Sequence, residues 1–248
     1  MNNFIYGFFY PFKCIKLFFK YPKLIAYSIV PIIINLIIYG AIFFYIYNRI
    51  IGSTQDVVED NVSNVIMFEL IQIFLKVFTF LLILVICYVL FIFFGGIISA
   101  PFNEKISKLI EEKVYKVNAG NELPFLKDAV ESIKAELKKI IFYLSGIIPL
   151  VVINFIPMIG SVISLVVGTA FSFFFNALEY LDYPLTRRRA GFREKLKIVN
   201  SKKMLSYGFG AMGFILTFIP VVNVLMNPIL VAAGTSLFYE KEYKSVKD

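Results

Sequence analysis

The side chains that carry most enzyme chemistry are scarce in this chain. Histidine is absent, and the two cysteines, Cys14 and Cys87, lie in different segments with no evident pairing. Zinc sites of ordinary ligand type and histidine-assisted nucleophiles are therefore excluded, and no disulfide framework is expected. No pair of carboxylates suggests acid–base catalysis. The sequence thus favours a protein that is not an enzyme and uses no cofactor or metal.

Polar side chains inside long apolar stretches are the more informative candidates. An amide or a charge at membrane depth costs free energy unless it is paired or hydrated, so such residues often mark a transport pathway. The predicted pathway residues are Asn35, Asn154, Asn223 and Asn227. The alternative is that these asparagines cap broken helices or bond between helices. Lys76, at the edge of an apolar stretch, is predicted to reach the outer interface.

The asparagines belong to three of four stretches that carry no charged side chain. These stretches are residues 24–48, 77–103, 140–178 and 204–239. A helix needs about 20 apolar residues to cross ~30 Å of hydrocarbon, and each stretch is longer than that. With 59% hydrophobic residues overall, the chain is predicted to be an all-α integral membrane protein that forms one domain over residues 1–248.

The basic residues predict how the chain crosses the membrane. Four lysines precede the first stretch, eight basic residues fall within 104–139 and eight within 182–203, but only Arg49 falls within 49–69. Basic residues beside membrane segments stay cytoplasmic. Both termini and both basic connections are therefore predicted inside the cell. Two ordinary transmembrane helices follow, 24–48 and 70–102, and the other two stretches must enter and leave by the cytoplasmic face.

Prolines divide those two stretches. Pro149 and Pro157 fall in the third, and Pro220 and Pro228 in the fourth. Because proline ends or kinks a helix, the arms on either side are expected to be short for a full crossing. We predict two hemi-penetrating helical hairpins, 140–180 and 204–239; pairs of short, tilted spans are the alternative. The shared spacing of eight residues, and the Gly-Thr that follows at 168–169 and 234–235, suggest a degenerate repeat.

The remaining segments are amphipathic. Lysines 13, 16, 20 and 23 fall on one face of a helix and Phe12, Ile15, Phe18 and Phe19 on another, which predicts an interfacial helix over residues 1–23 with membrane lipids as its partners. Residues 103–139 are predicted to form a cytoplasmic helical connection whose lysines and glutamates face solvent. The net charge of +8 follows from this topology, so nucleic acid is not expected as a partner.

A glycine pattern in the last stretch has two interpretations. Gly208, Gly210 and Gly213 fit the Gly-x-Gly-x-x-Gly fingerprint of dinucleotide sites. That fingerprint requires a preceding strand, whereas these glycines lie in an apolar helical stretch. We therefore predict close packing between helices.

Several blocks together resemble one family of membrane proteins. These blocks are Tyr21-Pro22-Lys23-Leu24, Ile98-Ser99-Ala100-Pro101-Phe102-Asn103-Glu104, Glu179-Tyr180-Leu181-Asp182-Tyr183-Pro184, Gly208-Phe209-Gly210, and Ile219-Pro220 through Asn227-Pro228. Their order and spacing are similar to those of the CysZ sulfate permeases and etoposide-induced proteins over nearly the whole chain. The resemblance implies two long transmembrane helices and two hemi-penetrating hairpins.

The resemblance also implies a function and a binding site. It implies ATP-independent uptake of sulfate or sulfite for cysteine biosynthesis across the bacterial inner membrane, by a homo-oligomer. In the family's bacterial permeases, a Pro-Gly-Leu-Arg turn binds sulfate through backbone amides and arginine. Here the turn reads Pro22, Lys23, Leu24 and Ile25, so bidentate recognition by arginine would be lost while helix-start amides and Lys23 remain.

A possible anion route follows from the helix breaks. Half-helices point amide groups and the positive end of a dipole into the membrane. We expect the breaks after Pro157 and Pro228, with Asn154 and Asn223 nearby, to line this route. The competing function is a membrane scaffold or lipid-interacting protein without anion transport, which the basic N-terminal helix and the missing arginine favour.

Overall fold

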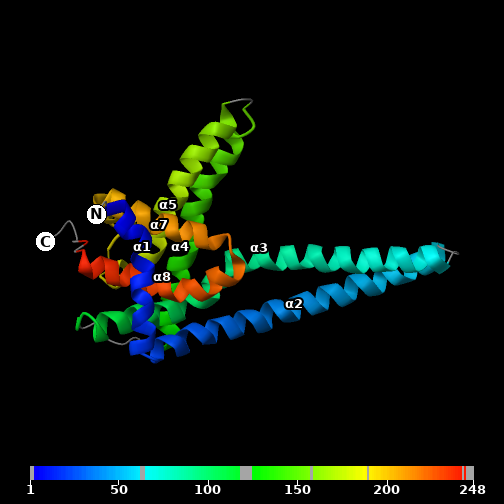
Figure 1. Ribbon diagram of the computed structural model, residues 1–248, viewed down its shortest axis with the longest axis horizontal. Helices are drawn as coiled ribbons and strands as arrows, with labels where there is room; N and C mark the ends of the chain where they lie inside the picture. The colour runs from blue at the N-terminus through cyan, green and yellow to red at the C-terminus, as the bar shows by residue number, and fades with distance from the viewer. Residues whose placement is uncertain are drawn as a thin grey trace. The chain divides into compact units, whose positions relative to one another are not determined.

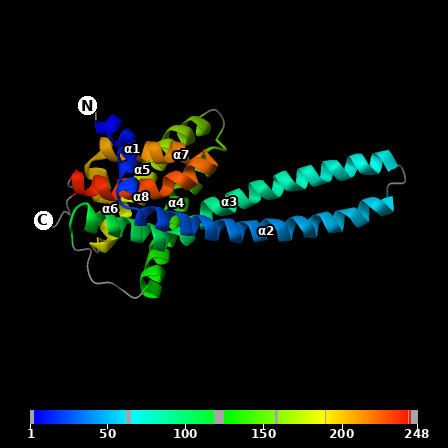
Figure 2. The same ribbon diagram turned by 60° about the horizontal axis from the view of Figure 1, so that its bottom comes forward.

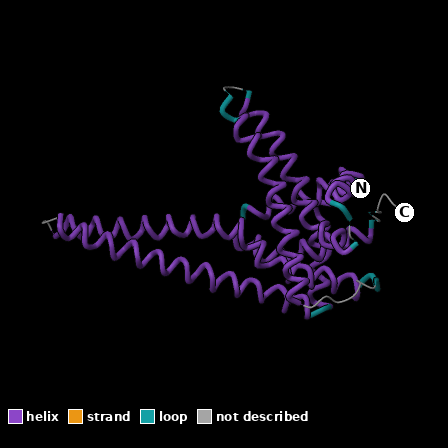
Figure 3. The backbone as a smooth tube through the Cα atoms, turned by 180° about the vertical axis from the view of Figure 1, so that it is seen from behind, coloured by secondary structure: helices purple, strands orange, loops and turns teal. Residues whose placement is uncertain are grey.

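The described part of the chain is helical throughout. The computed structural model describes residues 3–61, 65–117, 125–156, 159–188, 190–241 and 243. Its helices are α1 (Asn3–Lys20), α2 (Lys23–Asn61), α3 (Val65–Lys113), α4 (Phe125–Ile153), α5 (Gly160–Arg187), α6 (Phe192–Ser201), α7 (Lys203–Thr217) and α8 (Pro220–Glu240). The described residues contain no strand, which confirms the all-α prediction (Figure 3).

The chain divides into two compact units. Met1–Val30 and Ala100–Asp248 form the first, which we call the bundle unit, and Pro31–Ser99 forms the second, which we call the long-helix unit. α2 and α3 each contribute residues to both. That the whole chain acts as one domain stays a prediction.

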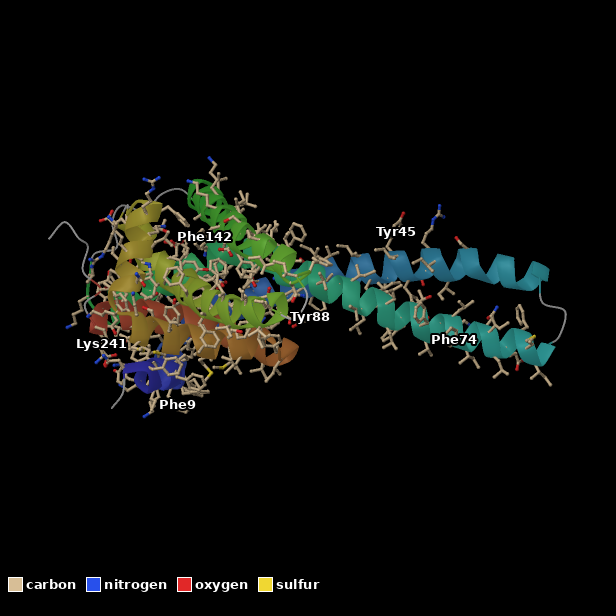
Figure 4. All side chains as sticks on the ribbon, turned by 90° about the horizontal axis from the view of Figure 1, so that it is seen from above. Phe9, Tyr45, Phe74, Tyr88, Phe142 and Lys241 are labelled. Atoms are coloured by element: carbon tan, nitrogen blue, oxygen red, sulfur yellow. The ribbon has the colours of Figure 1, made fainter. Side chains whose placement is uncertain are left out.

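The long-helix unit is an antiparallel pair of helices, visible side by side in Figures 1 and 2. The Tyr39 hydroxyl donates to the carbonyl of Leu90 at 3.3 Å, and the rings of Phe43 and Phe80 meet edge to face at 5.3 Å. Most other apolar side chains point outward, among them Tyr45 and Phe74, which are 73% and 67% exposed (Figure 4). Two helices alone cannot cover each other, so lipid is the natural solvent for this surface.

α2 and α3 are longer than the predicted spans. With 39 and 49 residues they reach about 58 and 73 Å at 1.5 Å per residue, well beyond the ~30 Å of hydrocarbon. The segments apolar enough to cross are Lys23–Ser53 and Ile66–Phe91. The connection predicted at residues 49–69 is itself helical wherever it is described, because no proline interrupts it.

The bundle unit has a continuous core built by α1, α5, α7 and α8. Glycines set how closely these helices approach. A Cβ at Gly208 would overlap the carbonyl oxygen of Phe4 in α1, and one at Gly210 would overlap that of Phe173 in α5; Gly213 faces the Asn176 side chain. The Gly-x-Gly-x-x-Gly pattern therefore serves helix packing, and that prediction is confirmed.

Two helix pairs occupy the positions of the predicted hairpins. α4 ends at Ile153 and α5 begins at Gly160, while α7 ends at Thr217 and α8 begins at Pro220 (Figure 3). Pro220 is at the start of α8, where the missing N–H costs nothing. Pro157 lies outside the described residues.

Two of the four prolines do not divide the chain as predicted. Pro149 lies inside α4 and Pro228 inside α8. The predicted break after Pro228 is therefore wrong, and α8 runs unbroken for 21 residues, about 32 Å. A full break in hydrocarbon would leave several backbone groups without partners, whereas one internal proline removes a single bond. Whether either pair stops partway through the bilayer stays a prediction.

Candidate functional site

The turn predicted to bind the anion connects α1 to α2. The amides of Leu24 and Ile25 donate to the carbonyls of Tyr21 and Pro22 at 2.9 and 3.0 Å, so these two helix-start donors already have partners within the turn. Leu24 is completely buried, whereas Lys23 and Ile25 are exposed. Of the four predicted residues, Lys23 is the one that presents a charge to solvent.

The end of α3 lies against this turn. The Tyr21 hydroxyl donates to the carbonyl of Lys113 at 3.3 Å, and the Lys20 ammonium lies 5.6 Å from the centre of the Tyr21 ring. The turn is thus anchored by Tyr21 on one side and by the buried Leu24 on the other, and it lies among lysines of α1, α2 and α3.

The predicted pathway asparagines have different surroundings. Asn35 belongs to the long-helix unit, is 4% exposed, and donates to the Pro31 carbonyl at 2.9 Å and to the Ser99 hydroxyl at 3.4 Å. It therefore bonds between α2 and α3. Asn154 is exposed beyond the end of α4.

The other two asparagines lie in α8. Asn223 is in the first turn of α8, and its backbone N–H donates to the Ile219 carbonyl at 2.7 Å. Asn227 buries its side-chain oxygen, which has no hydrogen-bond partner among the described residues. The end of α4 and the start of α8 lie apart in the bundle unit (Figure 1).

The bundle unit contains a buried polar network that joins α3, α5 and α8, which we call the Arg187 network. Its members are Glu104, Ser107, Glu111, Arg187, Thr235 and Tyr239. The Arg187 guanidinium contacts the Glu104 carboxylate and donates to Glu111 at 2.6 Å and to Ser107 at 2.5 Å. Ser107 in turn lies 2.6 Å from the Thr235 hydroxyl, and Tyr239 donates to Glu111 at 3.0 Å.

The charges of the Arg187 network are paired with one another. The Arg187 guanidinium contacts both carboxylates, and a second guanidinium, that of Arg188, lies 5.2 Å from the centre of the Tyr239 ring. Glu111 is only 2% exposed, and a buried pair of this kind is strongly destabilised when one partner is removed. The network is therefore suited to holding the C-terminal ends of α3, α5 and α8 together.

A second buried cluster joins the two most specific blocks of the family resemblance. Asn103, from the Pro-Phe-Asn block, donates to the Tyr183 hydroxyl of the Tyr-Leu-Asp-Tyr-Pro block at 3.2 Å. Above the Tyr183 ring, at 4.9 Å, lies the ammonium of Lys139, which pairs with Glu136 at 2.7 Å. Burial lowers the pKa of Lys139, but Glu136, Tyr183, Asp182 and Glu179 together outweigh burial and hold that pKa well above its usual value.

These buried charges correct the sequence-based interpretation of residues 103–139. The glutamates and lysines there were predicted to face solvent, yet Glu111, Glu136 and Lys139 are at most 7% exposed. The available signal was spacing, because Glu104, Ser107 and Glu111 recur at i, i+3 and i+7 and so share one helix face. Residue spacing alone did not show that α5 would supply an arginine to that face.

The fold and the site together define a class of protein. Within the described residues, four helices are long and apolar enough to cross a membrane, Lys23–Ser53, Ile66–Phe91, Gly160–Arg187 and Val222–Glu240, and no group of residues there is arranged to hold a metal ion. Polar residues inside these helices bond both to carbonyls of their own helix, as Asn176 does to Ser172, and to neighbouring helices, as Tyr39 does to Leu90. The chain is therefore an all-α integral membrane protein.

Comparison with known proteins identifies the family. The Sulfate transporter CysZ/Etoposide-induced protein 2.4 family matches residues 10–228, and the chain belongs to this family. A relative from Pectobacterium atrosepticum, named sulfate transporter CysZ, is 26% identical over 227 residues, which cover 89% of this chain and 80% of the relative. A relative of the same name from Salmonella typhi is 25% identical over 88% of this chain and 86% of its own length.

Proposed function

We propose that this protein is an ATP-independent permease that takes up sulfate, or sulfite, across the bacterial inner membrane and so supplies cysteine biosynthesis. The observation that carries the proposal is the family match over residues 10–228, together with curated relatives named sulfate transporter CysZ that align with most of the chain. Four apolar helices support the membrane location. The lysine distribution supports both termini in the cytoplasm.

The energetics of the substrate decide what the protein must supply. A bare dianion in hydrocarbon would cost tens of kcal/mol, so fixed donors have to replace its water. One such donor would be Lys23, because it is exposed at the start of α2 and nearby lysines reinforce its charge. Ile25 replaces the family's arginine, and a lysine point charge binds with less geometric selectivity than a bidentate guanidinium.

The route beyond Lys23 is proposed to run along the broken helix pairs. The amide ends are the starts of α5 at Gly160 and of α8 at Pro220, and they offer partial positive charge. Asn223 lies in the first turn of α8, and Asn154 lies in the connection that precedes α5. Since one chain keeps these two ends apart (Figure 1), a continuous route would need more than one copy. This supports a homo-oligomer in which the two pairs come from different protomers.

The test is uptake of radiolabelled sulfate into ATP-free liposomes that contain the purified protein. We expect saturable uptake, with unlabelled sulfite as a competitor. Lys23→Ala should raise the half-saturating sulfate concentration about fivefold, since one charge near an exposed site contributes about 1 kcal/mol. Lys197→Ala, which removes an exposed lysine of α6, is the matched control and should leave uptake unchanged. Uptake that persists when Asn154→Leu and Asn223→Leu are combined would disprove the proposed route.

The second candidate function is a membrane scaffold or lipid-interacting protein. The basic, aromatic helix α1 and the apolar Ile25 at the anion turn favour it. Absence of sulfate uptake above that of protein-free liposomes, with the protein shown to be folded by circular dichroism, would exclude the permease and leave this second function.

A further inference from the structure

α1 is attached to the bundle by one face only. Gly7, Tyr10, Pro11 and Cys14 are buried against α7 and α8. A Cβ at Gly7 would overlap the carbonyl oxygen of Leu205 in α7, and the Tyr10 hydroxyl donates to the Glu240 carboxylate at the end of α8. These contacts fix the rotation of α1 about its own axis and therefore fix which side chains face away from the bundle.

The opposite face of α1 is apolar and uncovered. Ile5, Phe9, Phe12 and Phe19 are 47%, 56%, 44% and 81% exposed, and their spacing places them along one stripe. Phe9 lies at the outer edge of the bundle unit (Figure 4). Such a stripe would be unfavourable in water, and it differs from the face predicted by sequence, because Phe18 packs inward against the core.

Lysines lie within and beside the exposed stripe. By helical periodicity Lys16 falls within it, between Phe12 and Phe19, and Lys20 lies along its edge. Lys13, at 61% side-chain exposure, lies 3.8 Å from Glu240. That carboxylate partly neutralises Lys13, so Lys16 and Lys20 carry most of the uncompensated charge of this face. The sequence contains no aspartate or glutamate before Asp56. The surface is thus complementary to an anionic partner.

The exposed stripe continues into a membrane-spanning helix. α1 passes through Tyr21 and Pro22 directly into α2, where Ile25, Ile29 and Val30 are 40%, 47% and 41% exposed at the start of the candidate span Lys23–Ser53. All of these residues belong to the bundle unit. The apolar surface of α1 therefore joins a surface that faces lipid.

We propose that the outward face of α1 is a binding surface for anionic phospholipids of the cytoplasmic leaflet. The aromatic rings lie at the level where headgroups meet acyl chains, and the ammonium groups of Lys16 and Lys20 contact lipid phosphates. Each lysine near such a surface favours anionic over neutral lipid by about fivefold. The proposal is independent of sulfate transport and would hold equally for a scaffold.

The absence of tryptophan from the chain provides a direct test. Phe19→Trp introduces a single fluorophore on the exposed stripe, and Phe192→Trp, on α6 at 37% exposure, introduces one on the matched control helix. Each full-length variant is placed in vesicles that contain either brominated phosphatidylcholine or brominated phosphatidylglycerol at equal mole fraction. Bromine quenches tryptophan only on contact, so the quenching reports which lipid lies beside the helix.

We expect the Phe19→Trp emission to be quenched by both lipids, and several-fold more efficiently by phosphatidylglycerol, while the Phe192→Trp emission responds weakly to both. Adding Lys16→Gln and Lys20→Gln should abolish the preference between the lipids and leave quenching by phosphatidylcholine in place. A blue-shifted emission that neither lipid quenches would mean that protein covers the stripe. A red-shifted emission quenched by aqueous iodide would mean that it faces water. Either result, or equal quenching by the two lipids, overturns the proposal, whether or not the vesicles take up sulfate.

Discussion

The two helix pairs α4–α5 and α7–α8 share a proline spacing and a Gly-Thr dipeptide, but they occupy different environments. In the most apolar part of α5, 22% of the residues are buried, compared with 56% in α8. The apolar side chains near the turn of the first pair are largely exposed, including Phe155 at 83% and Leu165 at 70%. In α8, by contrast, Leu230 and Leu237 are completely buried.

The Gly-Thr dipeptides show the difference at atomic scale. Gly234 lies so close to α5 that a Cβ there would be 2.5 Å from the Tyr180 carbonyl oxygen, and Thr235 bonds Ser107 of the Arg187 network. A Cβ at Gly168 would meet only the Leu150 side chain, at 3.7 Å. A repeat detected by sequence can therefore supply a structural helix in one copy and a lipid-facing helix in the other, because neighbouring helices decide which residues are buried.

The largest effect is expected at Arg187, where the two pairs meet. It is in the last turn of α5 and, through Glu111 and Ser107, is connected to Tyr239 and Thr235 of α8. Arg187→Met removes the guanidinium that pairs with the buried Glu111 carboxylate, so the unfolding free energy should fall by about 3–5 kcal/mol. Titration with SDS, followed by far-UV circular dichroism, measures this. Arg193→Met, on the exposed surface of α6, should change stability by under about 0.5 kcal/mol; equal effects would mean that the network does not stabilise the fold.

A smaller effect is expected when one leucine is truncated in each pair. Leu230→Ala creates a cavity in the core and should cost about 2–5 kcal/mol. Leu165→Ala removes a side chain that faces lipid, and lipid chains can fill the space, so its cost should be under about 1 kcal/mol. The same titration in lipid–detergent bicelles compares the two. A cost for Leu165→Ala that matches that for Leu230→Ala would show that protein, not lipid, covers the α4–α5 pair.

The smallest effect is expected from adding one methyl group to each Gly-Thr dipeptide. Gly234→Ala must push α8 away from Tyr180, which should lower the unfolding free energy by about 1–3 kcal/mol. Gly168→Ala should be neutral or slightly stabilising, because its Cβ would make an ordinary contact and alanine is the better helix former. Midpoints of thermal unfolding in detergent, followed by circular dichroism, distinguish the two. If both substitutions were neutral, Gly234 would not be more closely packed than Gly168, and the difference in environment between the two helix pairs would be wrong at this position.

Much of the fold could be predicted from the sequence because bilayer thickness constrains it. Stretches without charged residues predicted the apolar helices, and the glycine pattern at Gly208–Gly213 predicted close packing between helices. Helix ends were harder to predict. Pro228 does not break α8, since an unbroken helix leaves fewer backbone groups without partners, whereas Pro220 begins α8. α6 was missed because its sequence contains no long apolar run.

The polar core was less predictable than the helices. Burial of Glu111 and Lys139 depends on partners on other helices. Tyr239 lies 128 residues after Glu111 in the chain, and Tyr183 lies 44 residues after Lys139. From sequence alone, a charged residue on a helix is predicted to face solvent, because the helix that packs against it is not known. The family motifs Asn103 and Tyr183 marked the right region, but sequence gave no sign that they bond each other.

The contact between Gly7 and α7 has a consequence for biosynthesis. α1 is made first, but the residues that bury its inner face, Leu205 and Gly208, are added about 200 residues later, a delay of roughly 10–40 s at ordinary rates of translation. During that interval the nascent helix has no protein partner on either side. Its inner aromatic and cysteine side chains must wait for the C-terminal third of the chain, so a ribosome that stalls before α7 would leave α1 undocked and available to chaperones and proteases.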